Sequence, residues 1–130
     1  METLKLEIVT PDGQIFEDQI KSVTLPGSEG EFGVLPHHAS LVSLLQAGII
    51  DIELQNGSHE IVAIDWGHAK IDESKVMVLV DGAVAIVGKD ESAIAKAIAE
   101  GKKLIKGMSD SDVAIAVAFS KIDNVLKDRH

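Results

Sequence analysis

The chain is 130 residues long, 45% hydrophobic but only 3% aromatic, and carries a formal net charge of −9. This length allows one medium core, or a small domain with an appendage, and the hydrophobic content excludes a disordered or fibrous chain. Cysteine is absent, which excludes a disulfide scaffold, a thiolate zinc site and a cysteine nucleophile. Residues 1–87 hold fourteen acids against four lysines, a balance that favours solubility and disfavours nucleic acid as a partner.

Residues 1–87 have the pattern of short strands separated by turns. Apolar and polar residues alternate from Leu4 to Ile8, and the turn signal Pro11-Asp12-Gly13 follows. Further along, Asn56-Gly57 is a strong hairpin signal. In the run 75–80 the residues from Val76 to Val80 are all apolar, so we expect that strand to be covered on both faces. About eight to ten such strands predict an N-terminal antiparallel β-sandwich over residues 1–87.

Residues 88–130 change to a helical period. Asp90 is placed to cap a first helix, and Gly107 with the polar cluster 109–112 ends it. Apolar stripes at three- and four-residue steps comprise Ile94, Ala97, Ile98, Gly101, Leu104, Ile105 and Met108, then Ile115, Ala118, Phe119, Ile122 and Leu126. The short connection predicts an antiparallel two-helix hairpin. Because alanine contributes little apolar area, we expect this hairpin to be held weakly and to exchange packing partners.

Candidate catalytic residues lack the arrangement that catalysis needs. Ser28 is not in a Gly-x-Ser-x-Gly elbow, and we interpret it as part of an exposed turn. His37 and His38 would point to opposite faces of a strand, so they are poorly placed to chelate one ion. His59 and His68 could join them only through the tertiary fold. We therefore expect no catalytic residue, no metal site and no cofactor.

Two further segments suggest chemistry at first sight. Asp65-Trp66-Gly67-His68 contains an acid and a base, but we expect Trp66 to be a core or interface residue and Gly67 to mark a bulge. The glycine-rich stretch 27–33 has no phosphate-loop signature, and its two glutamates would repel a phosphate. An acidic loop that a protein partner grips is the better interpretation. Residues 1–3 show no basic leader, and no apolar run reaches the roughly 18 residues that cross a bilayer.

One long motif resembles a known family. Residues 25–42 read Leu-Pro-Gly-Ser-Glu-Gly-Glu-Phe-Gly-Val-Leu-Pro-His-His-Ala-Ser-Leu-Val, which is similar to the signature of the ε subunit of F-type ATP synthases, called δ in mitochondria. The segments 9–13, 48–50 and 64–67 match the family in order. The resemblance implies a non-catalytic central-stalk subunit of the proton-translocating synthase. Its partners would be the γ subunit, the c-ring and the catalytic β subunits, at the cytoplasmic face of a bacterial plasma membrane.

The resemblance also implies roles for single residues. It places Glu29 and Glu31 on a loop that faces the c-ring, and His38 and Ser43 on a surface that faces γ. This chain departs from the family at position 37, where His replaces the usual Gly, at position 40, where Ser replaces Pro, and at position 68, where His replaces an apolar residue. We expect the changes at positions 37 and 40 to alter the local backbone without changing the class of interface.

The family's helical hairpin folds against the sandwich or extends along γ, where it inhibits hydrolysis. The basic residues available for that regulatory role are Lys121, Lys127 and Arg129, interrupted by two acids, so we expect weak inhibition. Some bacterial members bind ATP through an Ile-Asp-x-x-Arg-Ala motif. The comparable stretch 92–97 has Ala93 for the Asp and Lys96 for the Arg, so we assign no ATP site.

Two other classes remain open from the residues alone. A free-standing sandwich could sense a nucleotide or small ligand through its hairpin. A small β-sandwich hydrolase or metal enzyme would have to use His38, His59 and His68. Clear binding of ATP in the presence of Mg²⁺ would support the first alternative. Replacement of the three histidines would abolish the activity that the second alternative requires.

Overall fold

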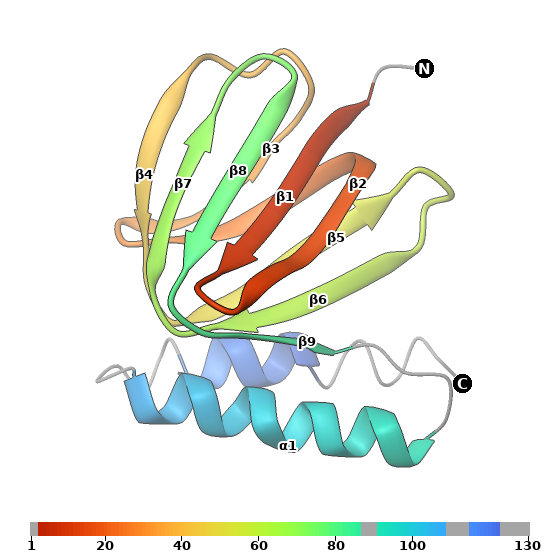
Figure 1. Cartoon of the computed structure of the whole chain (residues 1–130), viewed down its shortest axis with the longest axis vertical. Helices are drawn as coiled ribbons and strands as arrows, with labels where there is room; N and C mark the ends of the chain where they lie inside the picture. Colours follow the sequence, from red (N-terminus) through yellow and green to blue (C-terminus); the bar gives the residue numbers. More distant parts are fainter. Residues whose placement is uncertain (1–2, 87–90, 109–114, 123–130) are drawn as a thin grey trace.

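The computed structural model describes residues 3–86, 91–108 and 115–122. Within them nine strands lie in two layers, and two helices run beneath (Figure 1). The strands are β1 (Leu4–Thr10), β2 (Gly13–Gly27), β3 (Gly30–Val34), β4 (Leu41–Leu45), β5 (Gly48–Leu54), β6 (His59–Ile64), β7 (Gly67–Ile71), β8 (Lys75–Val80) and β9 (Ala83–Ile86). The helices are α1 (Glu91–Met108) and a second segment, 115–122. The predicted sandwich followed by helices is confirmed, and the predicted boundary at 87/88 lies outside the described residues.

Strand β2 connects the two layers because it is long enough to pair in both. Its first half pairs with β1, and its second half pairs with β3 and β5. One layer therefore has the order β1-β8-β7-β4, and the other has the order β3-β2-β5-β6-β9. The sandwich is mostly antiparallel, as predicted. In addition, β1 and β8 pair in parallel, which the long connection between them permits and the sequence pattern did not predict.

Aliphatic side chains fill the space between the layers. Strand β1 alternates strictly, so Leu4, Leu6 and Ile8 are fully buried. Each such side chain contributes about 1.5–3 kcal/mol relative to an exposed one. Strand β8 follows the same alternation, with Val78 buried and Leu79 40% exposed. The prediction that both faces of 75–80 are covered is therefore wrong, because one side of this layer is open in the described structure.

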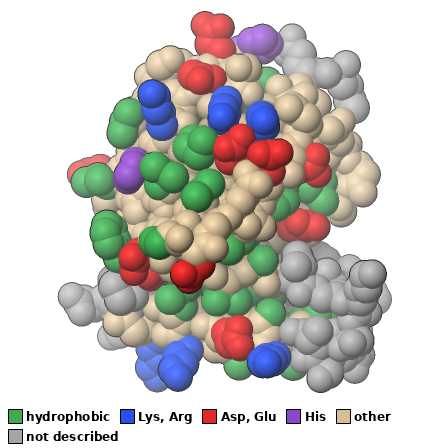
Figure 2. Space-filling view, viewed as in Figure 1, with side chains coloured by type: hydrophobic (Ala, Val, Ile, Leu, Met, Phe, Trp, Pro, Cys, Tyr) green, Lys and Arg blue, Asp and Glu red, His purple; other side chains and the backbone are tan. Residues whose placement is uncertain are grey.

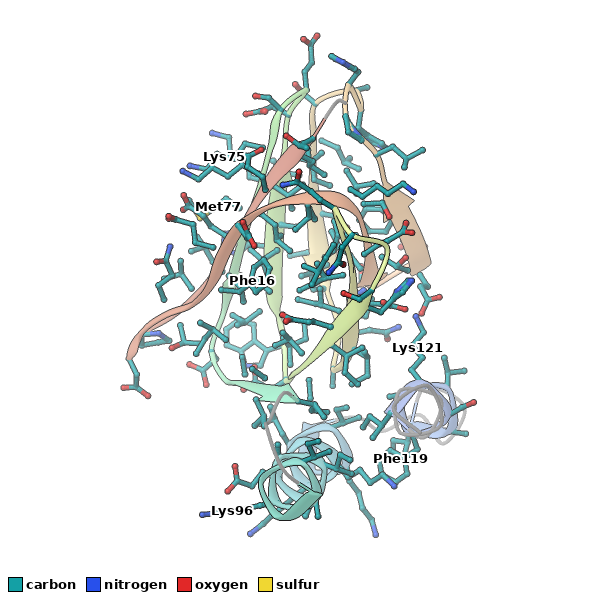
Figure 3. The ribbon with its side chains drawn as sticks, turned by 90° about the vertical axis from the view of Figure 1, so that its right-hand side faces the viewer. Phe16, Lys75, Met77, Lys96, Phe119 and Lys121 are labelled. Atoms are coloured by element: carbon teal, nitrogen blue, oxygen red, sulfur yellow. The ribbon has the colours of Figure 1, made fainter. Side chains whose placement is uncertain are left out.

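The helices pack on the second layer through a separate apolar cluster. Its members are Ile49, Ile61, Ala63 and Ile86 from the sheet, and Ile94, Ile98, Ile105, Ala118 and Ile122 from the helices. Gly101 allows close approach, because a Cβ there would lie 3.1 Å from the Cβ of Ala63. The two helices run in opposite directions in Figure 1 and lie side by side, seen end-on, in Figure 3. The buried isoleucines of the two predicted stripes thus pack on the sandwich, while the predictions for Asp90 and Leu126 fall outside the described residues.

Candidate functional site

The outer side of β1, β8, β7 and β4, here called the front face, is open to solvent. Because side chains alternate along a strand, the buried positions fix which residues point outward. The pairing registers then align the outward residues in two rows across the four strands. The apolar row holds Val9, Leu79, His68 and Leu44, and the mixed row holds Glu7, Met77, Lys70 and Val42. In Figure 2 hydrophobic side chains gather over these strands, with basic side chains above them.

Large apolar side chains are unusually exposed on and beside the front face. Val42 and Leu44 on β4 are 67% and 68% exposed, and Trp66 beside β7 is 54% exposed. Exposed apolar patches of this kind are typical of surfaces that bind a protein, a membrane or a ligand. The front face therefore has the character of a docking surface.

A shallow groove of about 370 Å³ lies at one end of the apolar row. Trp66 lines it, and a buried carboxylate, that of Asp65, fixes the turn that carries this ring. Asp65 Oδ1 accepts hydrogen bonds from the amides of Trp66 at 2.6 Å and Gly82 at 2.8 Å. These bonds tie the β6–β7 turn to the β8–β9 turn. The groove is lined by Val9, Thr10, Pro11, Trp66, Gly67, His68, Leu79, Val80 and Asp81.

The segment 65–68 does not form the acid–base pair considered from the sequence. Asp65 is buried and bonded to backbone amides, whereas His68 is exposed on the front face. Trp66 is not a core residue, and its role at an interface stays a prediction. The prediction of a bulge at Gly67 is wrong, since its pairing with β4 and β8 is continuous. Glycine is required there because a Cβ would overlap the carbonyl oxygen of Leu79.

A small group of charges lies at the other end of the front face. The ammonium groups of Lys5 and Lys75 each lie 3.4 Å from Glu7 Oε1. Desolvation raises the pKa of Glu7, but the hydrogen bonds and charges of Lys75 and Lys5 outweigh it, so the pKa lies below its usual value. Lys75 and Met77 project from the same side of the sandwich in Figure 3.

The glycine-rich stretch 27–33, here called the tongue, is a β-hairpin. Strands β2 and β3 pair from Val23 with Val34 to Gly27 with Gly30, and Glu29 lies in the exposed turn. Gly27 is required because a Cβ there would lie 2.7 Å from the carbonyl oxygen of Gly30. The tongue is anchored to the end of β4 by the amide of Ser28, which donates to the Leu44 carbonyl at 2.9 Å.

The tongue also touches the second helix. Lys121 Nζ lies 2.5 Å from Glu31 Oε2, and these side chains are 20% and 43% exposed. In Figure 3 Lys121 points from its helix toward the sandwich, and Phe119 points toward α1. The ammonium of Lys102 on α1 lies 5.0 Å from the Phe119 ring centroid. The structure therefore joins Glu31 and Lys121, for which the family resemblance implies different partners. Lys127 and Arg129 lie outside the described residues.

The pair predicted to face γ lies before and within β4. His38 is in the β3–β4 connection, and its Nδ1 lies 2.7 Å from the Ala39 carbonyl oxygen. Ser43 alternates with Val42 and Leu44, so it points away from the front face, and its Oγ donates to the Leu44 carbonyl at 3.2 Å. His37 lies in a turn with φ of 67°, so the expectation of two adjacent histidines on a strand is wrong.

Several front-face residues were not predicted as site residues. The pairing register of β4, β7 and β8 forms the docking surface, because it places Val42, Leu44, Lys70 and Leu79 side by side. A weak sequence signal existed at 41–45, where apolar residues occupy both parities of a short strand. A strand with apolar residues on both sides needs a second covering surface.

Among the described residues, the histidine not yet placed has a structural partner. His59 Nδ1 lies 2.8 Å from Asp51 Oδ1 across β5 and β6. The described residues contain no group of three His, Cys, Asp or Glu side chains able to hold a metal ion. On α1, Lys96 points away from the sandwich in Figure 3. In the part of the chain that the structure describes, neither helix has the length and apolarity to span a membrane.

These features define the class of protein: a β-sandwich that is followed by two helices and leaves one sheet face open to solvent. Residues 3–86 match the model of the family described as ATP synthase, Delta/Epsilon chain, beta-sandwich domain. ATP synthase epsilon chains of Campylobacter curvus and Campylobacter fetus are each 58% identical over 129 residues, which cover 99% of this chain and 100% of each relative. The chain therefore belongs to the family of ATP synthase delta and epsilon chains, proteins of ATP synthesis and ion transport.

Solved structures share the fold. A chain in the Euglena gracilis mitochondrial ATP synthase structure (OSCP/F1/c-ring) matches with a TM-score of 0.63 and 24% identity, over 99% of this chain and 82% of that one. A chain in the Tetrahymena thermophila mitochondrial ATP synthase central stalk/c-ring structure matches with a TM-score of 0.54 and 14% identity, over 82% of this chain and 96% of that one.

Proposed function

We propose that the chain is a non-catalytic subunit of the central stalk, which couples rotation of the c-ring to ATP synthesis through γ. Family membership and the exposed apolar front face together carry this proposal. A torque-transmitting subunit needs a rigid body with surfaces for two partners. The sandwich offers the front face and the tongue as two such surfaces.

The front face suits γ. An apolar surface that stays exposed in the free chain costs solubility, and a partner that covers Val42, Leu44 and Trp66 removes that cost. His38 lies in the connection that leads into β4, so a partner seated on the β4 edge would come within its reach. Ser43 would act through the edge of β4, because it points away from the front face.

The tongue suits the c-ring. Its turn is exposed, acidic and held at both ends by strand pairing, so Glu29 is presented on a rigid support. Glu31 shares the tongue and would face the same partner when Lys121 is elsewhere. Carboxylates on a firm hairpin can select basic or hydrogen-bonding groups of polar loops. Membrane attachment would then be peripheral and indirect, at the cytoplasmic face.

The hairpin suits a regulatory role. In the described structure it lies on the second layer, and Lys121 is engaged by Glu31. A helix that left this position would free Lys121, together with the basic residues that follow it in sequence, for the catalytic β subunits. Since few basic residues are available, the brake on hydrolysis would be weak.

Reconstitution tests the proposal. The full chain is added to the synthase from which this subunit has been removed, and coupled ATP synthesis and binding to the γ–c-ring assembly are measured. We expect the chain to restore coupling. A Leu44→Asp variant, which places a charge in the apolar row without touching the core, should bind at least tenfold more weakly. Failure of the unaltered chain to bind or to restore coupling would refute the proposal.

A further inference from the structure

The front face carries an unusual share of the positive charge of the sandwich. Residues 1–87 contain four lysines among fourteen acids, and three of these lysines lie on this one face: Lys5, Lys70 and Lys75. Two acids lie beside them, Glu7 in the mixed row and Asp72 next to Lys75 after β7, so lysines still outnumber acids on this face of a strongly acidic domain. The basic side chains stand together above the apolar patch in Figure 2.

Lys70 is the least satisfied of the three lysines. Lys5 and Lys75 share the carboxylate of Glu7. Lys70, by contrast, is exposed between Val42 and Met77 and has no acidic partner among the described residues. An ammonium flanked by apolar side chains is placed to be desolvated when a partner docks, and it then requires a carboxylate opposite.

We infer that the partner of the front face presents an apolar strip flanked by a carboxylate, and that Lys70 selects it. This inference rests on the proposed function, so the occupant is the foot of γ. The apolar strip would cover Leu44 and Leu79, and the carboxylate would meet Lys70. A second copy of the chain fits less well, because two front faces packed about a two-fold axis would bring two net-positive surfaces together.

Two charge-reversal variants that have the same net charge as each other test the inference. Lys70→Glu reverses the charge on the front face, and Lys21→Glu makes the same change on β2, where Lys21 is 57% exposed and pairs with Glu53. Binding of each full-length variant to the γ-containing catalytic complex lacking this subunit is measured at 50 and 500 mM salt. We expect Lys70→Glu to weaken binding at least tenfold at low salt and less at high salt. Lys21→Glu should stay within about twofold of the unaltered chain, whose own affinity should fall with salt.

The outcomes separate the two claims. If the unaltered chain binds but both variants bind equally well, or binding does not depend on salt, the inference is overturned while the proposed function stands. If the unaltered chain does not bind the complex, the proposed function itself fails. Self-association of the chain that Lys70→Glu abolishes would identify a second copy as the occupant and would also overturn the inference. Thermal unfolding of both variants confirms that each is folded.

Discussion

Removing the Glu31 carboxylate should loosen the second helix from the sandwich. The ion pair between Glu31 and Lys121 joins the tongue to segment 115–122, and its side chains are 43% and 20% exposed. Solvent screening at this exposure limits its contribution to about 0.3–1 kcal/mol. Glu31→Gln should therefore raise the opening constant of the second helix by roughly two- to fivefold.

Native-state hydrogen exchange of the amides in 118–122 measures this opening directly. A double-mutant cycle isolates the ion pair, and it compares Glu31→Gln, Lys121→Gln and the double variant. Either single variant already breaks the pair, so the opening constant of the double variant should not exceed the larger of the two single-variant values. Glu29→Gln is the matched control, since it removes a tongue carboxylate that makes no ion pair with a described residue. Additive effects in the cycle, or an equal effect of Glu29→Gln, would show that the Glu31–Lys121 pair does not hold the second helix on the sandwich.

Three other changes test the local physics. His37→Gly relieves a left-handed backbone at φ 67° and should raise the unfolding free energy, measured by urea titration, by about 0.5 kcal/mol. A lower unfolding free energy would show that the imidazole contributes more than the backbone strain costs. Gly67→Ala should destabilise the sandwich by about 2 kcal/mol or more, because its methyl group overlaps the Leu79 backbone, and an unchanged melting temperature would contradict this. The pKa of Asp72 is lowered chiefly by a hydrogen bond from the Ser74 amide and further by one from the Lys75 amide. The Asp72 carboxylate therefore stabilises the fold above about pH 4, and this stabilisation is lost as the pH falls. Asp72→Asn should flatten the acid limb of the curve of unfolding free energy against pH, and an unaltered acid limb would contradict this.

The sequence predicted the architecture because its patterns are local. Alternation in 4–8 gave a strand with one buried side, and the stripe from Ile94 to Ile105 gave a helix with one buried side. The exposed turn at Ser28 followed from its glycines, and its place in the β2–β3 hairpin agrees. These features depend on neighbours within a few residues, so periodicity is sufficient to find them.

The docking surfaces could not be predicted in the same way because they depend on register. Lys70 faces Val42 and Met77 only because β7 lies between β4 and β8, and β8 reaches β1 through a parallel pair. Likewise, contact between Glu31 and Lys121 joins residues ninety positions apart through the docking of a helix. Trp66 was predicted as a core or interface residue, and local pattern could not decide between the two, since a turn can hold a large ring outside the core when a buried carboxylate fixes its backbone.

Protection of one engineered cysteine shows whether a partner covers the front face in the assembled synthase. The chain has no cysteine, so Leu44→Cys on the front face and Asn56→Cys in the β5–β6 turn each give a single reactive group. Maleimide labelling is compared between the free chain and the assembled synthase. Labelling at position 44 should slow at least tenfold on assembly, while labelling at position 56 should be unchanged. Equal labelling at position 44 in both states would show that the front face is not where the rotor holds this subunit.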